Sequence, residues 1–386
     1  MRRERNTLVG TPTVIAPEAI FLVGEFGLPE EEVAVLAALS SHATAQYCPD
    51  VVAPSLLVAA VVERAYDHLG EAATALPPGS VLLSLAQPQD GDGHAFDTTP
   101  AIAVAAAAAV FEAAGQSIRK RKDEILVVAE AAHRDAHPGI GAEGELAAAL
   151  HGGLIKVVFQ PQAAPRIEAL APPAGLHLVV FQTGCALFPA DWLASVHQFA
   201  ERYPIAYAQI IKDLLERASR FAAELSEGNA TAAVVSAGRY GDCIVQLAAA
   251  VSAPMQSAPL LQAMELAKAI GGIAKTTSAA HSDLGIAIFA TPEAASLFAR
   301  ACQPPLVPLY LDLDRGGVRQ ILAPTGESAE IHTPWPETDP SSISSEAIVR
   351  GFLDDASTER TLSELDPDLP ASRRRHPGQA FSSRWR

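Results

Sequence analysis

A polar stretch with two glycines lies between a short apolar strand and an alanine-rich helix, and this order of elements could bind phosphate. The strand is predicted over residues 81–85, the polar stretch covers 87–97, and the helix covers 100–114. Glycine lets the backbone approach a phosphate closely, and the free N–H groups at a helix N-terminus attract anions. A phosphate-binding loop is therefore expected immediately before Pro100.

The composition indicates a folded, acidic protein that is long enough for two domains. The chain has 386 residues, of which 49% are hydrophobic and 19% are charged, so it can bury a sizeable core. Its net charge of −16 repels phosphate backbones and anionic lipid, so we expect no nucleic acid and no membrane as a partner. An anionic substrate would need local basic residues to overcome this charge.

Cysteine usage and hydropathy favour a cytoplasmic location. The cysteines are widely spaced and form no C-x-x-C pair, which disfavours a zinc site or a disulfide framework; they are Cys48, Cys185, Cys243 and Cys302. No apolar signal-peptide stretch follows the charged N-terminus before Pro12. The longest apolar run, residues 101–111, is about half the ~20 residues that a membrane helix needs.

Apolar periodicity predicts strands and helices in alternation, which is typical of an α/β protein. The expected strands are 13–26, 81–85, 176–182, 285–289 and 306–313. The expected helices are 55–69, 100–114, 122–136, 145–150, 191–203, 206–225, 229–252, 260–270 and 292–302. Gly70 and Asn229 are expected to cap helices.

Several segments, in chain order, are similar to the motifs of one enzyme family. They are Ala16-Pro-Glu-Ala-Ile-Phe-Leu-Val-Gly-Glu25, Ala131-Ala-His-Arg-Asp-Ala136, Glu145-Leu-Ala-Ala-Ala-Leu-His-Gly-Gly153, Thr183-Gly184, Phe199-Ala-Glu-Arg202, Ala269-Ile-Gly-Gly-Ile-Ala-Lys275, Asp283-Leu-Gly-Ile-Ala-Ile288 and Pro308-Leu-Tyr-Leu-Asp-Leu-Asp-Arg-Gly-Gly-Val318. In this order they resemble the GHMP small-molecule kinases, and phosphomevalonate kinase most closely. The resemblance covers roughly residues 12–322.

The resemblance implies a two-layer α+β fold, the GHMP-kinase fold, and a division of the chain. Residues 1–12 would be a flexible N-terminus, 13–170 a nucleotide-type N-terminal domain and 171–322 an α/β C-terminal domain. Residues 323–386 are rich in proline and serine, which predicts a disordered tail with one amphipathic helix over 344–353. The basic end of this tail could contact an acidic partner or RNA, or could stay solvated.

The resemblance implies two ATP-binding loops, and the first has lost its glycines. The family's G-L-G-S-S-A-A becomes Ala-Phe-Asp-Thr-Thr-Pro-Ala over 95–101, so Asp97 adds negative charge and Pro100 removes an N–H donor. Thr98 could offer its hydroxyl to Mg²⁺, as the family's serine does, or could cap the following helix. The implied nucleotide-binding positions here are Ala95, Asp97, Thr98 and Thr99.

The second implied ATP loop keeps its length but loses every glycine. The family's K-P-S-G-A-G-G-G-D becomes Lys-Thr-Thr-Ser-Ala-Ala-His-Ser-Asp over 275–283. The implied nucleotide-binding positions are Ser278, Ala280 and Ser282, and Lys275 is the implied catalytic cation. His281 could bind an anion or could be an incidental loop residue.

The resemblance also implies a substrate site and a catalytic base. The positions that would face a substrate are Ala19, Glu25, Gly184 and Cys185, and at Ala19 and Cys185 the family has lysine. Glu145 takes the place of the family's catalytic aspartate and could accept a proton from a substrate hydroxyl. Glu145 also lies in the first turn of a predicted helix, where the macrodipole favours acidic residues whatever the function.

Two hypotheses follow from these losses. In the first, the chain is a pseudokinase or repurposed binding protein linked to mevalonate and isoprenoid metabolism, whose partner is a small phosphorylated metabolite or a paralogous kinase subunit. In the second, it is an active ATP-dependent phosphomevalonate kinase with atypical loops, and its cofactors are then ATP and Mg²⁺. Loss at several points within an intact hydrophobic frame favours the first. Basic residues converging on the cleft, such as Lys275 and Lys156, would favour the second.

Overall fold

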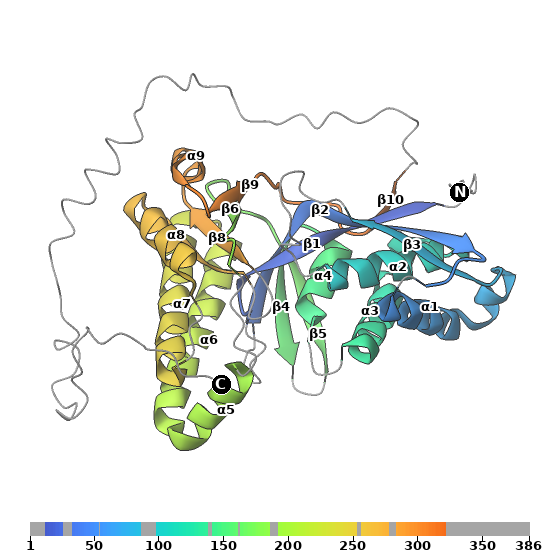
Figure 1. Cartoon of the computed structure of the whole chain (residues 1–386), viewed down its shortest axis with the longest axis horizontal. Helices are drawn as coiled ribbons and strands as arrows, with labels where there is room; N and C mark the ends of the chain where they lie inside the picture. Colours follow the sequence, from blue (N-terminus) through green and yellow to red (C-terminus); the bar gives the residue numbers. More distant parts are fainter. Residues whose placement is uncertain are drawn as a thin grey trace, which may run out of the picture. The chain divides into compact units, whose positions relative to one another are not determined.

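Two long strands in the N-terminal half form the centre of a six-stranded antiparallel sheet (Figure 1). From one edge to the other the strands are β10 (Arg319–Ile321), β1 (Thr13–Val23), β2 (Val33–Pro49), β4 (Leu154–Gln160) and β5 (Ala163–Leu170), and β3 (Gly79–Leu85) also pairs with β2. This computed structural model describes residues 12–25, 33–53, 55–85, 98–137, 141–160, 163–185, 192–252, 256–277 and 283–321.

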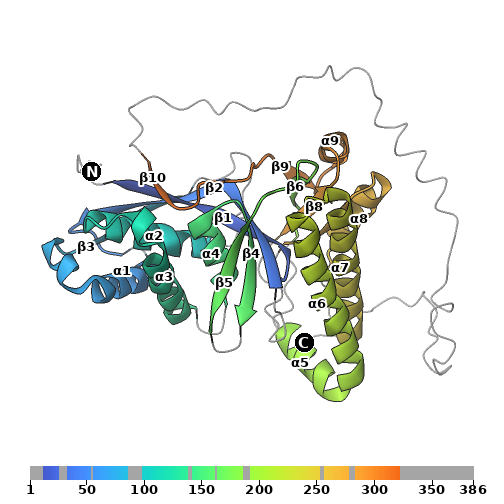
Figure 2. The same cartoon turned by 180° about the vertical axis from the view of Figure 1, so that it is seen from behind.

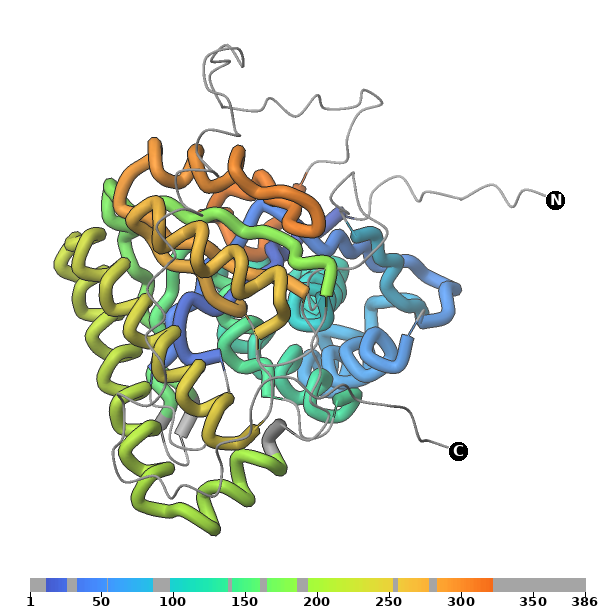
Figure 3. The backbone as a smooth tube through the Cα atoms, turned by 60° about the vertical axis from the view of Figure 1, so that its left-hand side comes forward, coloured from blue at the N-terminus to red at the C-terminus, as the bar shows by residue number. Residues whose placement is uncertain are grey.

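Three helices of the N-terminal half, α1 (Leu56–Leu69), α2 (Thr99–Ala113) and α4 (Glu143–His151), pack against this first sheet, and α3 (Lys122–Ala136) packs against these helices. Short 3₁₀ turns are η1 (Gly70–Ala75) and η2 (Ile118–Lys120). Every residue of α2 from Ala103 to Phe111 is 0% exposed, and Figure 3 shows this helix (cyan) surrounded by its neighbours. Eight of these nine residues are alanine or valine, whose small side chains let strands and helices approach α2 closely.

A second antiparallel sheet lies in the C-terminal half, with its own helices (Figure 2). Its strands in order are β7 (Ile273–Thr276), β8 (Leu284–Phe289), β6 (His177–Gln182) and β9 (Val307–Leu309). The helices are α5 (Trp192–Arg202), α6 (Pro204–Ser226), α7 (Ala230–Val251), α8 (Ala258–Ala269) and α9 (Pro292–Ala301). One apolar core joins the halves, because Leu22 and Val35 of the first sheet cluster with Phe221 of α6 and Tyr240 of α7.

Helix ends follow the capping residues in the sequence. The Asn229 side chain accepts a hydrogen bond from the Ala232 N–H at 3.0 Å, so the predicted cap of α7 is confirmed. Gly70 ends α1 with a φ of 52°, a conformation that glycine adopts without strain, so this cap is confirmed too. The prediction for 122–136 coincides with α3.

The strand predictions contain one wrong strand and also miss the strands β2, β4, β5, β7 and β10. The single strand expected over 306–313 is wrong, because only Val307–Leu309 pairs with β6 and Leu313 instead bridges to Leu39 of β2. The chain crosses from the second sheet to the first between them. The long strand β2 was not predicted, because its alanine, serine and threonine residues show no clear apolar alternation.

The domain boundaries and the tail stay predictions. Residues 323–386 and the helix expected over 344–353 lie outside the described residues. The described residues all belong to one compact unit, which covers 1–328. None of the helices described in it has both the length and the apolar character needed to cross a bilayer.

Gly317 is expected to tolerate alanine far less than Gly115, although both have a positive φ. A Cβ atom at Gly317 (φ 61°) would lie 2.5 Å from the carbonyl oxygen of Leu150, whereas nothing lies within 4 Å of one at Gly115 (φ 72°). Gly115→Ala should cost about 1–2 kcal/mol from its left-handed backbone alone. Gly317→Ala should cost about 2 kcal/mol more from the backbone clash. Urea unfolding of both variants measures the difference, and equal losses would contradict the close approach at Gly317.

Candidate functional site

Glu25 and Lys275 form an ion pair inside the protein, although 250 positions separate them. Glu25 follows β1, Lys275 lies in β7, and Lys275 Nζ is 2.8 Å from Glu25 Oε1. The side chains are 0% and 2% exposed. Burial raises the pKa of Glu25, and the charge and hydrogen bond of Lys275 oppose that rise. The two positions implied for substrate binding and for catalysis are therefore bound to each other.

Tyr240 of α7 completes this cluster and was missed by the sequence analysis. Its hydroxyl accepts a hydrogen bond from the Gly24 N–H at 2.8 Å, and Lys275 Nζ lies 5.7 Å from the centre of its ring, within the range of a cation–π contact. Tyr240 is 0% exposed. A single tyrosine in an alanine-rich helix is the only sequence signal for it. The Thr276 hydroxyl also reaches Glu25, at 3.4 Å.

The N-terminus of α2 is the described part of the first implied ATP loop. Thr98 holds the N-cap position but has helical dihedral angles and forms no side-chain capping bond, so capping by its hydroxyl is not observed. The Thr99 hydroxyl lies 3.2 Å from Nε2 of His133, which is 2% exposed on α3. Pro100 falls in the first turn and has no N–H to offer an anion.

Glu145 lies in the first turn of α4, where the sequence analysis expected it. Glu143 shares this turn, and Glu145 is half-buried. Gly144 between them is buried, and a Cβ atom there would lie 3.2 Å from Leu36 and 3.4 Å from Phe21. This close approach fixes the start of α4 against β1 and β2. The location suits both interpretations of Glu145, as a base and as a macrodipole partner.

The other implied substrate positions are more exposed. Ala19 is half-buried on β1, and Gly184 and Cys185 are exposed after β6. The Thr183 hydroxyl donates to the Asp283 carbonyl at 2.8 Å and accepts from the Cys185 N–H at 3.3 Å. The turn at Gly184 is thereby tied to the start of β8, directly after the second implied ATP loop.

Other predicted positions lie outside the described residues. They are Ala95, Asp97, Ser278, Ala280, His281 and Ser282. Lys156, which could have faced a cleft, forms an ion pair of 3.1 Å with Glu168 on the neighbouring strand. A groove of about 580 Å³ along α6 is lined by Tyr207, Ala208, Ile211, Lys212, Leu215, Glu216 and Ser219, none of which is a predicted site residue.

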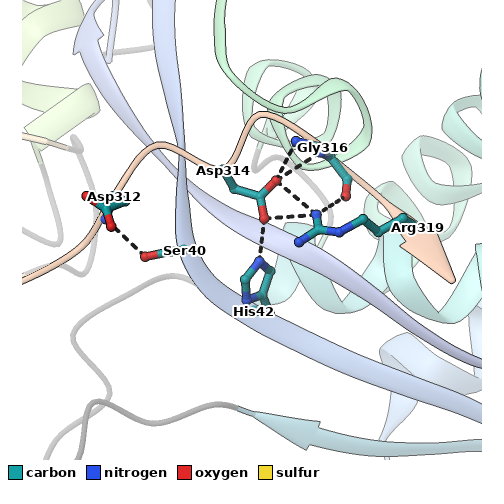
Figure 4. Close-up of polar contacts among 7 residues, drawn as sticks. Ser40, His42, Asp312, Asp314, Gly316 and Arg319 are labelled. Carbon is teal, nitrogen blue, oxygen red and sulfur yellow. Dashed lines mark hydrogen bonds and ion pairs between the residues drawn. The ribbon is translucent and has the colours of Figure 1, made fainter. Parts of the chain in front are cut away.

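A second polar cluster surrounds Asp314, where the chain returns to the first sheet (Figure 4). Nε2 of His42 is 2.5 Å from Asp314 Oδ2, and one guanidinium nitrogen of Arg319 is 2.9 Å from each carboxylate oxygen. The N–H groups of Gly316 and Gly317 also donate to this carboxylate. Burial alone would raise the pKa of Asp314, but the hydrogen bonds from His42, Arg319 and Gly316 lower it to about 2.

Comparison with known proteins identifies the fold. No protein-family model matches the sequence. No curated protein matches it. The Lin0012 protein from Listeria innocua has a similar structure, with a TM-score of 0.71 and 17% identity over 81% of this chain and 99% of that chain. Phosphomevalonate kinase from Streptococcus pneumoniae has a TM-score of 0.66 and 14% identity over 78% of this chain and 98% of that chain. L. major mevalonate kinase in complex with R-mevalonate has a TM-score of 0.59 and 17% identity over 78% of this chain and 94% of that chain.

The chain therefore has the GHMP-kinase fold, a mixed α/β fold with two antiparallel sheets. This confirms the fold that the order of motifs implied. Identities of 14–17% establish the fold alone, because one fold supports many activities. The particular activity depends on the residues of the site.

Proposed function

We propose that this chain is a phosphomevalonate-kinase-like pseudokinase, a GHMP-fold protein that has lost ATP binding and serves as a binding protein linked to isoprenoid metabolism. The observation that carries the proposal is the loss of phosphate-binding groups, with Pro100 in the first turn of α2 and Ala19 and Cys185 where the resemblance implies lysine. Phosphoryl transfer needs cations that neutralise the charge on the phosphates. Of the lysines implied for the site, Lys275 remains, and it is paired with Glu25 at 2.8 Å.

The start of α2 supports the same proposal. A phosphate at a helix N-terminus is held by free backbone N–H groups, and Pro100 contributes none in this first turn. The hydroxyl of Thr99 is engaged with buried His133 rather than free for a metal ion. These two features weaken both the anion cradle and the Mg²⁺ ligand that an ATP site requires.

The proposed ligand is a small phosphorylated metabolite or a paralogous kinase subunit. The net charge of −16 and the pairing of Lys156 with Glu168 disfavour tight binding of a multiply charged anion, so a protein partner fits the described surface better. The alternative function, an active ATP-dependent phosphomevalonate kinase, is favoured by one observation. Glu145 keeps a half-buried carboxylate at the start of α4, where it could act as a base.

Titration of Mg·ATP into the purified chain, followed by calorimetry, tests the proposal. We expect no binding heat and no thermal shift at millimolar nucleotide, because the implied ATP site lacks an available cation and one backbone N–H donor. Affinity in the micromolar range would overturn the proposal and leave the kinase as the better account.

Two matched variants separate the roles of Glu145. Glu145→Gln and Glu143→Gln remove one negative charge each from the same helical turn. We expect no ATP-dependent phosphorylation of mevalonate-type acceptors by the wild type or by either variant. If the wild type turns over and Glu145→Gln alone loses about 10²–10⁴-fold, Glu145 is a general base and the chain is an enzyme.

A further inference from the structure

Helix α6 buries one face and exposes the other. It lies beside α7, and Leu214, Ala218 and Phe221 on its inner side are at most 1% exposed (Figure 2). Residues three or four positions apart share one side of a helix, and such a series of exposed residues runs along the opposite side. We call this series the outer face of α6; its members are Ile205, Gln209, Lys212, Glu216, Ser219 and Ala223.

The outer face of α6 combines charged and apolar surface. Lys212 and Glu216 are 66% and 58% exposed, and their charged atoms are 3.8 Å apart, which is too far for a hydrogen bond. Both side chains can therefore turn towards another partner. Ile205 is 87% exposed at one end of the face, and Lys212, Glu216 and Ser219 help to line the groove of about 580 Å³.

The residues of this face are self-complementary about position 214. When two identical helices pair antiparallel about a twofold axis at that position, residues equally far from it on either side face each other. Lys212 then faces Glu216 of the second copy, and Glu216 faces Lys212 of the second copy. A parallel pair would instead oppose like charges at both positions. The other facing pairs of the antiparallel arrangement are Gln209 with Ser219 and Ile205 with Ala223.

We propose that the outer face of α6 is an interface between two copies of this chain, which pair antiparallel about a twofold axis. A second copy is the occupant because the complementary charges lie on this one helix, so two identical faces satisfy each other. The inference goes beyond the proposed function, since α6 contains none of the residues implied for ATP or substrate binding.

The size of α6 makes this a weak dimer. The helix has 23 residues and is therefore about 34 Å long. A contact stripe about 10 Å wide along it covers about 340 Å² on each copy, which is less than half of the roughly 800 Å² per partner in a standard interface. We expect a dissociation constant of about 10–100 µM that rises with added salt, because the facing charges are exposed.

Sedimentation equilibrium of the full chain from about 3 to about 300 µM tests the inference. Lys212→Glu opposes two carboxylates at each facing pair, and Glu216→Lys opposes two ammonium groups. Each variant alone should dimerise at least about tenfold more weakly than the wild type. An equimolar mixture of the two variants restores opposite charges at both pairs, so it should form a heterodimer with an affinity within about threefold of the wild type.

Lys268→Glu is the matched control, because it makes the same change of charge at an exposed position on α8. It should dimerise like the wild type. A wild type that stays monomeric throughout would overturn the inference and leave the outer face to a different protein. A dimer that Lys212→Glu leaves intact, an equal loss in Lys268→Glu, or a mixture that stays monomeric would overturn it too. The Tm of each variant shows that these exposed substitutions leave the fold unchanged.

Discussion

Lys275→Met is expected to destabilise the protein by about 3–5 kcal/mol, which is the usual effect of leaving one partner of a buried ion pair alone. Glu25 would remain 0% exposed with no cation beside it. The double variant Glu25→Leu/Lys275→Met should recover most of the loss, since two apolar side chains of similar volume are often as stable as a buried pair. Urea unfolding of the wild type, both single variants and the double variant gives the coupling free energy.

The loss in Lys275→Met should depend on pH. The pKa of Glu25 is already raised by burial, and removing Lys275 removes the largest effect that opposes the rise. Between its ordinary value of 4.5 and the raised value, the folded state binds more protons than the unfolded state, so the free energy of unfolding falls as pH rises. We therefore expect Lys275→Met to be less stable at pH 8 than at pH 5.

Lys212→Met is the matched control for this prediction. Lys212 is 66% exposed on α6, and its nearest ion-pair partner, Glu216, is 3.8 Å away. Exposed pairs of this kind contribute roughly 0–1 kcal/mol. If Lys275→Met were no more destabilising than Lys212→Met, the buried pair would not stabilise the packing of β1 against β7 and α7.

Asp314→Asn is expected to destabilise the protein by about 2–4 kcal/mol, because the side chain is 4% exposed and its carboxylate pairs with Arg319 and is hydrogen-bonded to His42. A neutral amide cannot balance Arg319, and its NH₂ group would face donors from Gly316, Gly317 or His42. The cluster fixes the segment that crosses between the two sheets. The Asp314 carbonyl in this segment also accepts a hydrogen bond from the Gly153 N–H at 2.6 Å. Chemical denaturation at pH 7 measures the loss.

The same carboxylate makes the wild type sensitive to acid. The pKa of Asp314 is about 2 in the folded protein and ordinarily 3.8, so its stabilisation is complete above pH 3.8 and is lost as pH falls towards 2. The shift corresponds to about 2 kcal/mol at 1.36 kcal/mol per pKa unit. Asp314→Asn should therefore lose less stability between pH 5 and pH 2.5 than the wild type. Asp312→Asn, at an exposed position two residues earlier, should behave like the wild type.

Local sequence patterns determined most of the helices. The Asn229 cap, the glycine after Leu69 and the apolar periodicity of 122–136 each act within a few residues, so they are visible in the sequence. The order of the motifs along the chain indicated the fold. They are spread over most of the chain, and their order implied the GHMP-kinase fold that the similar structures confirm.

The tertiary structure alone decided how the charged residues are used. The sequence placed Glu25 and Lys275 in separate motifs with separate roles, and no local pattern predicts that a residue before position 26 will contact one after 270. The roles of Tyr240 and of the partners of Asp314 could not be predicted from the sequence for the same reason. An ion pair depends on a few ångströms of separation and on exclusion of water, and both are set by the packing of distant elements against one another. The sequence therefore determined the helices and the fold of this protein. The packing of β1, β7 and α7 decided that Lys275 faces the buried carboxylate of Glu25.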